Sequence, residues 1–280
     1  MIGILLLGGT GTRLYPLTKV VNKHLLPVYN KPLVYYSISI LMLLGIKKII
    51  LVVNKEHIND FKSLFKDGSK YGIEIQYVIQ KKPLGIVNAI QVSKKKIKKN
   101  DFVLMLGDNF FYGNNLINDF EKIKFSKHLS QIICKEVSNP QNYGVLIKNK
   151  NKFKIIEKPR NPKTNLAVCG IYFYKNKVLK FLKKVKKTNR KEFEISDFNN
   201  ILINNNLLRF KELPRGNTWF DCGSVKDFNE VTKFVEIIEK RQNIMIGSLG
   251  EIAFRKKWIN KKKLIKIADN KKELDYFKTL

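Results

Sequence analysis

The chain has 280 residues, 44% of them hydrophobic, which is enough to bury a complete core in one or two domains. Its 54 Lys and Arg residues exceed its 23 Asp and Glu residues and give a formal net charge of +31. No stretch reaches the roughly 18 uninterrupted apolar residues of a membrane span, so we expect a soluble, cytoplasmic protein with no membrane partner.

Strand and helix patterns alternate through the first half of the chain. Pro32 opens the first expected helix and Gly45 closes it, as is usual for helix ends. Such alternation is typical of a parallel sheet covered on both faces, which binds ligands beyond the carboxyl ends of its strands. The expected strands are residues 2–7, 49–53, 73–79 and 102–106, and the expected helices are residues 33–44, 56–65 and 86–97.

The second half is richer in strand patterns and predicts a mixed extension of the sheet. The expected strands are residues 129–137, 145–147, 152–157, 168–174 and 207–213, followed by long helices at residues 225–241 and 261–268. Neither a Pro/Gly/Ser-rich linker nor a repeat of fixed period divides the chain. We therefore predict a single α/β domain over residues 1–280, with a doubly wound, mostly parallel but mixed Rossmann-like sheet and C-terminal helices.

A glycine-rich segment after the first strand is the strongest local signal. It consists of Gly8, Gly9, Thr10, Gly11, Thr12 and Arg13. Glycines let backbone N–H groups approach phosphate oxygens, and Arg13 adds a planar fork of donors. The segment lacks the Lys of a Walker loop, and Leu14 replaces the third glycine of the dinucleotide fingerprint. We interpret it as a triphosphate cradle, with a simple tight turn as the alternative.

Charged residues at later positions suit the same kind of ligand. Lys23 follows the glycine segment and would neutralise a leaving pyrophosphate. Asp108 and Asp221 stand at expected strand ends, where carboxylates suit Mg²⁺, although Asp also favours turns for its own sake. Glu157 and Lys158 end another strand, and read alone they are an ordinary charged strand end.

Runs of basic residues at 94–99, 183–187 and 261–263 raise nucleic-acid binding as an alternative function, because clustered lysines release counterions from a phosphate backbone. These runs fall at the ends or faces of expected helices and carry no interleaved aromatic residues. We interpret them as solvated helix faces and expect no nucleic-acid partner.

The cysteines and histidines carry no recognisable framework. Cys134, Cys169 and Cys222 are an odd number without paired spacing, and the three histidines are scattered along the chain. These spacings favour neither disulfides nor a zinc site.

Taken in order, the motifs resemble those of the sugar-1-phosphate nucleotidylyltransferases, and the closer match is to the glucose-1-phosphate thymidylyltransferases. The resemblance covers nearly the whole chain, and its collinearity is more specific than any one motif. It rests on GGTGTRLYPLT, KHLLPV, LGDN, YGV, EKP, CGIYFY, EISD, WFDCG and EIAFRKKWI.

The resemblance implies a role for each matching position. It implies a nucleotide-binding half at residues 1–128, a sugar-phosphate-binding half at 129–224 and a helical tail at 225–280. Nucleotide binding falls to Gly8, Gly9, Gly11, Thr12, Arg13, Lys23, Gln80, Gly85 and Asp108, and sugar-phosphate binding to Tyr143, Gly144, Glu157, Lys158, Val168 and Arg190. Within these sets, Gln80 and Gly85 face the base, Glu157 binds the sugar hydroxyls, and Lys158 and Arg190 bind the 1-phosphate. The metal ligands are Asp108 and Asp221, and the catalytic set is Arg13, Lys23, Lys158, Asp108 and Asp221.

Several positions depart from the family pattern. His24 stands where the family has Gln, Lys191 where it has Gly, and Asn114 where it has His beside a feedback site. Cys169 and Cys222 stand for threonines. The loop at residues 84–88 is also altered, which leaves the preferred base open.

The activity implied is formation of dTDP-glucose and pyrophosphate from dTTP and glucose 1-phosphate by a Mg²⁺-dependent homotetramer, as a step toward deoxysugars or polysaccharides. The same chemistry with UTP is the nearest alternative. A basic nucleic-acid-binding protein and an inactive sugar-nucleotide sensor are alternatives of other classes, and the presence of both Asp108 and Asp221 argues against the sensor.

Overall fold

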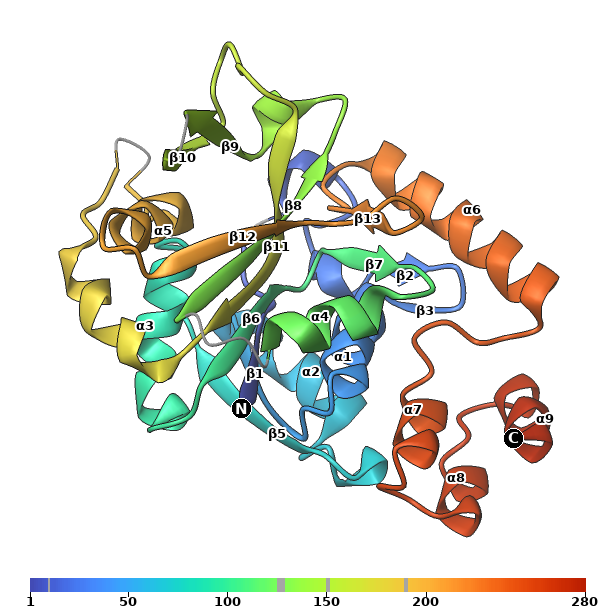
Figure 1. Ribbon diagram of the computed structural model, residues 1–280. Helices are drawn as coiled ribbons and strands as arrows, with labels where there is room; N and C mark the ends of the chain where they lie inside the picture. Colours follow the sequence, from blue (N-terminus) through green and yellow to red (C-terminus); the bar gives the residue numbers. More distant parts are fainter. Residues whose placement is uncertain (10, 125–128, 150–151, 189–190) are drawn as a thin grey trace.

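Four parallel strands form the centre of the computed structural model, which describes residues 1–9, 11–124, 129–149, 152–188 and 191–280 (Figure 1). They lie in the order β5-β4-β1-β6, so the first strand is central and the chain winds outward from it in both directions. Numbered along the chain, the four strands have the order 3-2-1-4, as in the first four strands of the doubly wound sheet. The strands are β1 (Ile2–Leu6), β4 (Lys48–Val53), β5 (Glu74–Ile79) and β6 (Phe102–Leu106).

Beyond β6 the sheet becomes mixed. The long strand β11 runs antiparallel to β6, β8 and β9, while β12 runs parallel to β8 and β10 pairs with β9. These strands are β8 (Ser130–Glu136), β9 (Gly144–Asn149), β10 (Lys152–Glu157), β11 (Leu166–Tyr174) and β12 (Leu208–Glu212). Two small sheets lie beside them, formed by β2 (Pro27–Val28) with β3 (Lys31–Pro32) and by β7 (Phe110–Tyr112) with β13 (Thr218–Phe220).

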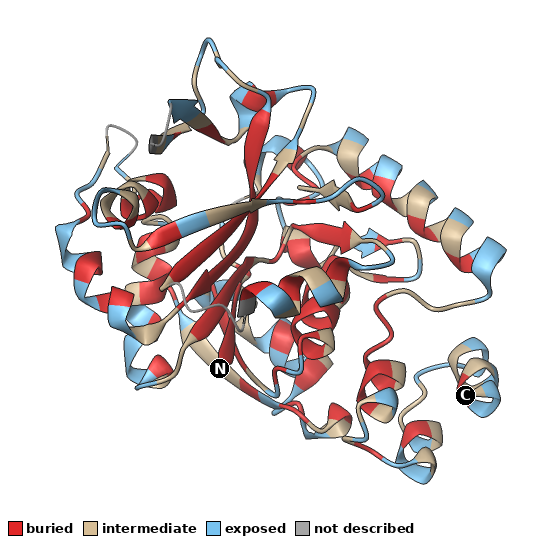
Figure 2. Cartoon of the chain, viewed as in Figure 1, coloured by how far each residue is buried: buried red, intermediate tan, exposed pale blue. Residues whose placement is uncertain are grey.

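Helices cover both faces of the sheet, and buried residues are concentrated in its strands (Figure 2). Neighbouring residues of β1 face opposite cores, because side chains alternate along a strand. Leu5 packs with helices α1 (Leu33–Leu43), α2 (Ile58–Phe65) and α4 (Leu116–Lys124). Ile4 packs on the other face with α3 (Ile86–Ile97) and α5 (Ile195–Asn204).

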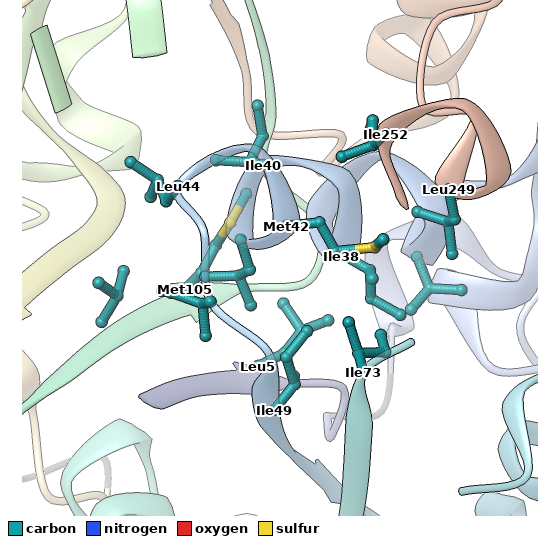
Figure 3. Close-up of a cluster of buried hydrophobic side chains, with 14 of the residues drawn as sticks. Leu5, Ile38, Ile40, Met42, Leu44, Ile49, Ile73, Met105, Leu249 and Ile252 are labelled. Atoms are coloured by element: carbon teal, nitrogen blue, oxygen red, sulfur yellow. The ribbon is translucent and has the colours of Figure 1, made fainter. Parts of the chain in front are cut away.

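Helix α1 is apolar on nearly every side because it is covered twice. One side faces the sheet, and α7 (Leu249–Arg255) lies on another through Leu249 and Ile252 (Figure 3). The short helices α8 (Lys261–Lys266) and α9 (Lys271–Thr279) extend the same core. Each fully buried Leu or Ile stabilises the fold by about 1.5–3 kcal/mol relative to an exposed one.

Helix α6 (Val225–Gln242) packs against a third, smaller core beside the N-terminal loop. It begins with a capping box, in which the Ser224 hydroxyl accepts from the Asp227 backbone and Asp227 accepts from the Ser224 backbone. Val231 and Val235 of α6 reach Leu14 and the buried Cys222 in this core. The helix therefore braces the segment that carries Asp221.

The predicted doubly wound, mixed α/β fold is confirmed, with most boundaries shifted by one or two residues. The predicted helix at residues 261–268 was wrong in length: α8 ends at Lys266, because Asn270 caps the next helix by accepting from Glu273 N. The predicted helix at 56–65 begins with a 3₁₀ turn, Lys55–His57. Helices α4, α5, α7 and α9 and the strands β7 and β13 were not predicted.

Surface features follow the expectation for solvated lysines. In the run at residues 94–99, the side chains of Lys94, Lys95, Lys98 and Lys99 are exposed, and Ile97 is buried. All three cysteines are buried and unpaired. Among the described residues, no helix combines the length and the apolar character that crossing a bilayer requires.

Candidate active site

A cavity of about 240 Å³ opens beside the carboxyl end of β6, between the two halves of the sheet. Predicted residues from both halves meet in its wall, which is where a doubly wound sheet places its ligands. Residues 1–128 contribute Arg13 and Asp108, and residues 129–224 contribute Tyr143, Gly144, Glu157, Lys158, Val168 and Asp221.

Asp108 and Asp221 form an electrostatic pair in this cavity. Burial raises the pKa of Asp221, and the negative charge of Asp108 raises it further, against the opposing charges of Arg13 and Lys23. Burial also acts to raise the pKa of Asp108, but the charge of Lys23 and hydrogen bonds from Lys23 and Asn109 outweigh it and lower this pKa. The two carboxylates therefore differ in proton affinity although they share one site.

Lys23 enters the site from the 3₁₀ turn Lys23–Leu25 and donates from Nζ to Asp108 Oδ2. Asn22 fixes this turn to the end of β1, because its side chain donates to the Leu7 carbonyl at 2.9 Å. Lys23 is not part of the cavity wall itself. It reaches the site through its ion pair with Asp108.

His24 is buried directly behind this ion pair. Its Nδ1 lies 2.7 Å from Asn22 Oδ1, and its ring lies against Gly107, where a Cβ atom would be 2.8 Å from His24 Cδ2. Burial, together with the charge of Lys23, lowers the pKa of His24 to about 3. His24 is therefore a neutral support for the Gly107–Asp108 turn.

The glycine segment adopts the conformation that glycine favours. Gly9 and Gly11 have φ values of 101° and 61°, and an added Cβ at Gly9 would meet no atom within 4 Å. The backbone there is consequently accessible to a ligand. The next turn, Thr12–Leu14, carries Arg13 into the cavity, where its guanidinium lies against Gly223: a Cβ there would be 3.0 Å from both terminal nitrogens.

Residues 129–224 contribute a hydrogen-bonded carboxylate and a lysine with a strained backbone. Ser196 Oγ donates to Glu157 Oε2, which fixes one carboxylate oxygen toward α5. Lys158 has a φ of 43°, in the left-handed region, and its backbone N–H donates to the Tyr143 carbonyl at 2.9 Å. Such strain is commonly retained where a side chain must point into a site.

Several predicted residues lie outside the cavity wall. Gln80 is buried, and its amide nitrogen donates to the Gly85 carbonyl at 3.1 Å and to Asn88 Oδ1 at 3.0 Å, so it braces the altered loop. Gly8 lies next to Gln80, since an added Cβ would be 3.4 Å from Gln80 Oε1. Besides Lys23, the other described residues that were predicted but lie outside the wall are Gly9, Gly11, Thr12 and Gly85. Thr10 and Arg190 fall outside the described residues.

The structure adds residues to which the sequence assigned no role. Helix α5 brings Ser196 and Asn199 to the cavity, preceded by Glu194 at its N-cap. Tyr172 of β11 and Trp219 of β13 also line the cavity, and the ring centroids of Trp219 and Tyr143 are 5.1 Å apart. EISD and WFDCG marked these segments, but nothing local in them indicates which side chains point inward.

Comparison with known families defines the class of the protein. Residues 2–237 match the family model described as nucleotidyl transferase. The matched region contains every strand of the sheet and every residue of the cavity wall. The chain belongs to the nucleotidyl transferase family, and the predicted class of enzyme is confirmed.

Comparison with individual members of the family is more specific. The chain is 40% identical over 270 residues to a glucose-1-phosphate thymidylyltransferase of Neisseria meningitidis serogroup A, covering 96% of this chain and 94% of the relative. It is 37% identical to one from Mycobacterium tuberculosis, covering 96% and 93%. The resemblance drawn from the motifs is thereby confirmed.

Solved structures agree with the fold. A Bacillus anthracis protein assigned as a glucose-1-phosphate thymidylyltransferase, in complex with sucrose, superposes with a TM-score of 0.77 at 34% identity, covering 84% of this chain and 94% of that one. A UDP-glucose pyrophosphorylase complexed with UDP-glucose gives a TM-score of 0.75 at 22% identity, covering 85% and 99%. The second likeness shows the shared fold alone.

Proposed function

We propose that the protein transfers a thymidylyl group from dTTP to glucose 1-phosphate and releases pyrophosphate. The observation that carries this proposal is a single cavity lined by Arg13 and Asp108 on one side and by Glu157 and Lys158 on the other. Phosphate-binding groups and a sugar-binding carboxylate thus share one site. The names of the relatives support the choice of thymidine nucleotide and of glucose 1-phosphate.

The reaction requires no protein nucleophile. A phosphate oxygen of glucose 1-phosphate attacks the α-phosphorus of dTTP and forms a new P–O bond. The bond from that phosphorus to the bridging oxygen of the β-phosphate breaks, and its electron pair leaves with pyrophosphate. Positioning and charge neutralisation are sufficient for such a displacement.

Each cation in the site has a place in this scheme. The backbone of the open glycine segment and Arg13 would hold the triphosphate, and Lys23 would neutralise the leaving pyrophosphate. Lys158 would bind the phosphate of the sugar, while Glu157, oriented by Ser196, would accept hydrogen bonds from sugar hydroxyls. The aromatic rings of Tyr143 and Trp219 would exclude water beside the sugar.

Asp108 and Asp221 fit a divalent cation. Both side chains line one cavity, where they offer carboxylate oxygens, and the charge of Asp108 adds to burial in raising the pKa of Asp221. Mg²⁺ commonly takes one or two carboxylates and completes its shell with water and substrate phosphates. When bound, Mg²⁺ would neutralise charge on the transferring phosphates. Lys23 would then exchange its hydrogen bond with Asp108 for one with phosphate.

A pyrophosphate-release assay over a matrix of nucleotides and sugar 1-phosphates tests the proposal. We expect the highest kcat/KM for dTTP with glucose 1-phosphate. A maximum at UTP would replace the thymidylyl assignment with the uridylyl one, and the absence of release from any pair would refute nucleotidyl transfer. The homotetramer remains a prediction, which sedimentation velocity would test.

A further inference from the structure

Asn109, the residue after Asp108, uses its side-chain amide to join three segments of the site. It lies in the turn between β6 and β7 and is only 2% exposed. Its Nδ2 donates to Asp108 Oδ1 at 2.9 Å. Its Oδ1 accepts from the backbone N–H of Gly170 at 2.9 Å and from Trp219 Nε1 at 2.6 Å.

The hydrogen bond from Trp219 connects Asn109 to the segment that carries Asp221. Trp219 stands two residues before Asp221 on β13, and this short strand pairs with β7, with Phe220 opposite Phe110. A backbone ladder and one side-chain hydrogen bond therefore attach the segment before Asp221 to the segment after Asp108. A strand pair of three residues is weak by itself, which gives the side-chain bond more influence over its position.

The side-chain amide of Asn109 has little room to move. An added Cβ at Gly170 would lie 2.4 Å from Asn109 Oδ1, so the side chain is pressed against the backbone of β11. The amide provides one acceptor for two N–H donors and one donor for a carboxylate. An aspartate would repel Asp108, and an apolar residue would leave the Trp219 and Gly170 donors unpaired in a buried place.

We propose that Asn109 is the positioning residue that sets Asp108 and Asp221 at the separation needed to bind one divalent cation between them. The inference rests on the proposed function, because it takes these aspartates to be the metal ligands. Asp108 is held on one oxygen by Lys23 and on the other by Asn109. Asp221 receives its placement through Trp219. Outer-shell partners of this kind typically change metal affinity 10- to 100-fold when they are removed.

The test measures Mn²⁺ binding in the presence of dTTP without glucose 1-phosphate, by the electron paramagnetic resonance signal of free Mn²⁺, after subtraction of the Mn²⁺ that dTTP binds in a titration without protein. Trp219→Phe removes the N–H donor and keeps an aromatic ring beside Tyr143, and Asn109→Ala removes the whole link. We expect the Kd for Mn²⁺ to rise about 10-fold or more in each variant. The double variant should cost no more than Asn109→Ala, because both changes break one connection.

Two control variants separate a failure of the positioning role from a failure of the metal site. Trp258→Phe changes the other tryptophan, which lies outside the cavity wall, and should leave the Kd for Mn²⁺ unchanged. Asp108→Asn should raise the Kd strongly. A Kd within twofold of the wild type in Trp219→Phe, with Asp108→Asn impaired, would overturn the positioning role alone. Unchanged Mn²⁺ binding in Asp108→Asn would refute the metal site and this inference with it.

Discussion

Lys23 Nζ donates a hydrogen bond to Asp108 Oδ2, across 85 residues of sequence. The ion pair is largely shielded, with side-chain exposures of 15% and 17%. We assign Lys23 to the pyrophosphate and Asp108 to the metal. In the free protein, the charges of these two residues neutralise each other. Binding of nucleotide and metal would separate them, so that Lys23 would face the triphosphate and Asp108 the metal.

Replacing either metal-site carboxylate should lower turnover and preserve the fold. Asp108→Asn and Asp221→Asn each remove one charge at nearly constant volume, and we expect kcat to fall about 10²-fold or more. Steady-state kinetics at saturating Mg²⁺ and circular dichroism measure the two effects. Asp60→Asn, at an exposed position of α2, is the matched control. Near-normal turnover in either site variant would contradict the assignment.

Lys158 should matter for the sugar phosphate and not for the nucleotide. Lys158→Met should lower kcat/KM for glucose 1-phosphate by the equivalent of about 1.5–3 kcal/mol, the worth of one charged hydrogen bond. Binding of dTTP, measured by calorimetry, should change little. Lys154→Met, on β10 four residues before Lys158 and outside the cavity wall, controls for the loss of charge. An equal loss in dTTP binding and in kcat/KM for glucose 1-phosphate would show that Lys158 does not act on the sugar phosphate alone.

The strand ends could be predicted from sequence because they depend on local patterns. Asp108 follows five apolar residues, and Gly9 and Gly11 mark the turn after β1. The role of Ser196 could not be predicted, since its bond to Glu157 depends on how α5 packs against a strand 39 residues earlier. Gln80 illustrates a different limit. The family resemblance assigned Gln80 to the base, whereas the structure shows its amide nitrogen bonded to the Gly85 carbonyl and to Asn88 Oδ1.

The strands β7 and β13 were missed for a related reason. Each has three residues, which is too short for an alternating pattern to be recognised, and they pair although more than a hundred residues separate them. Trp219 and Asn109 meet only because of this pairing. The helical tail was predicted in part: α6, which has a capping box and an extended apolar stripe, and the short α8 were predicted, whereas α7 and α9 were not.

Stability should fall in mild acid because of His24. Its folded pKa is lowered to about 3, from 6.5, by burial first and then by Lys23. Between these values the unfolded chain binds a proton that the folded chain does not, so stability falls as the pH drops. From pH 7.5 to 5 the wild type should lose about 2 kcal/mol more unfolding free energy than His24→Gln.

Urea unfolding at the two pH values measures this difference. His57→Gln is the control, because His57 lies at the surface beside Asp60, where its ring nitrogen is 3.1 Å from the carboxylate. An equal loss of stability in the wild type and in His24→Gln would show that His24 is not held neutral in the folded protein.

The selectivity for dTTP over UTP should be moderate. Thymine differs from uracil by one methyl group. Its burial alone is worth about 0.8 kcal/mol, or about fourfold, whereas a pocket fitted to one methylene-sized group discriminates by about 1–3 kcal/mol, or about 10- to 200-fold. We therefore expect kcat/KM for dTTP to exceed that for UTP within this range, with dUTP between them because it lacks only the methyl. A value for UTP equal to or above that for dTTP would contradict the thymidylyl assignment.

Product analysis by ³¹P NMR tests the central claim most directly. With dTTP, glucose 1-phosphate and Mg²⁺, we predict that the resonances of both substrates disappear together, and that pyrophosphate and a sugar-linked diphosphate ester appear in equal amounts. Omission of glucose 1-phosphate should abolish pyrophosphate formation. Release of inorganic phosphate from dTTP, or pyrophosphate formed without the sugar phosphate, would contradict direct nucleotidyl transfer at the site formed by Arg13, Asp108, Lys158 and Asp221.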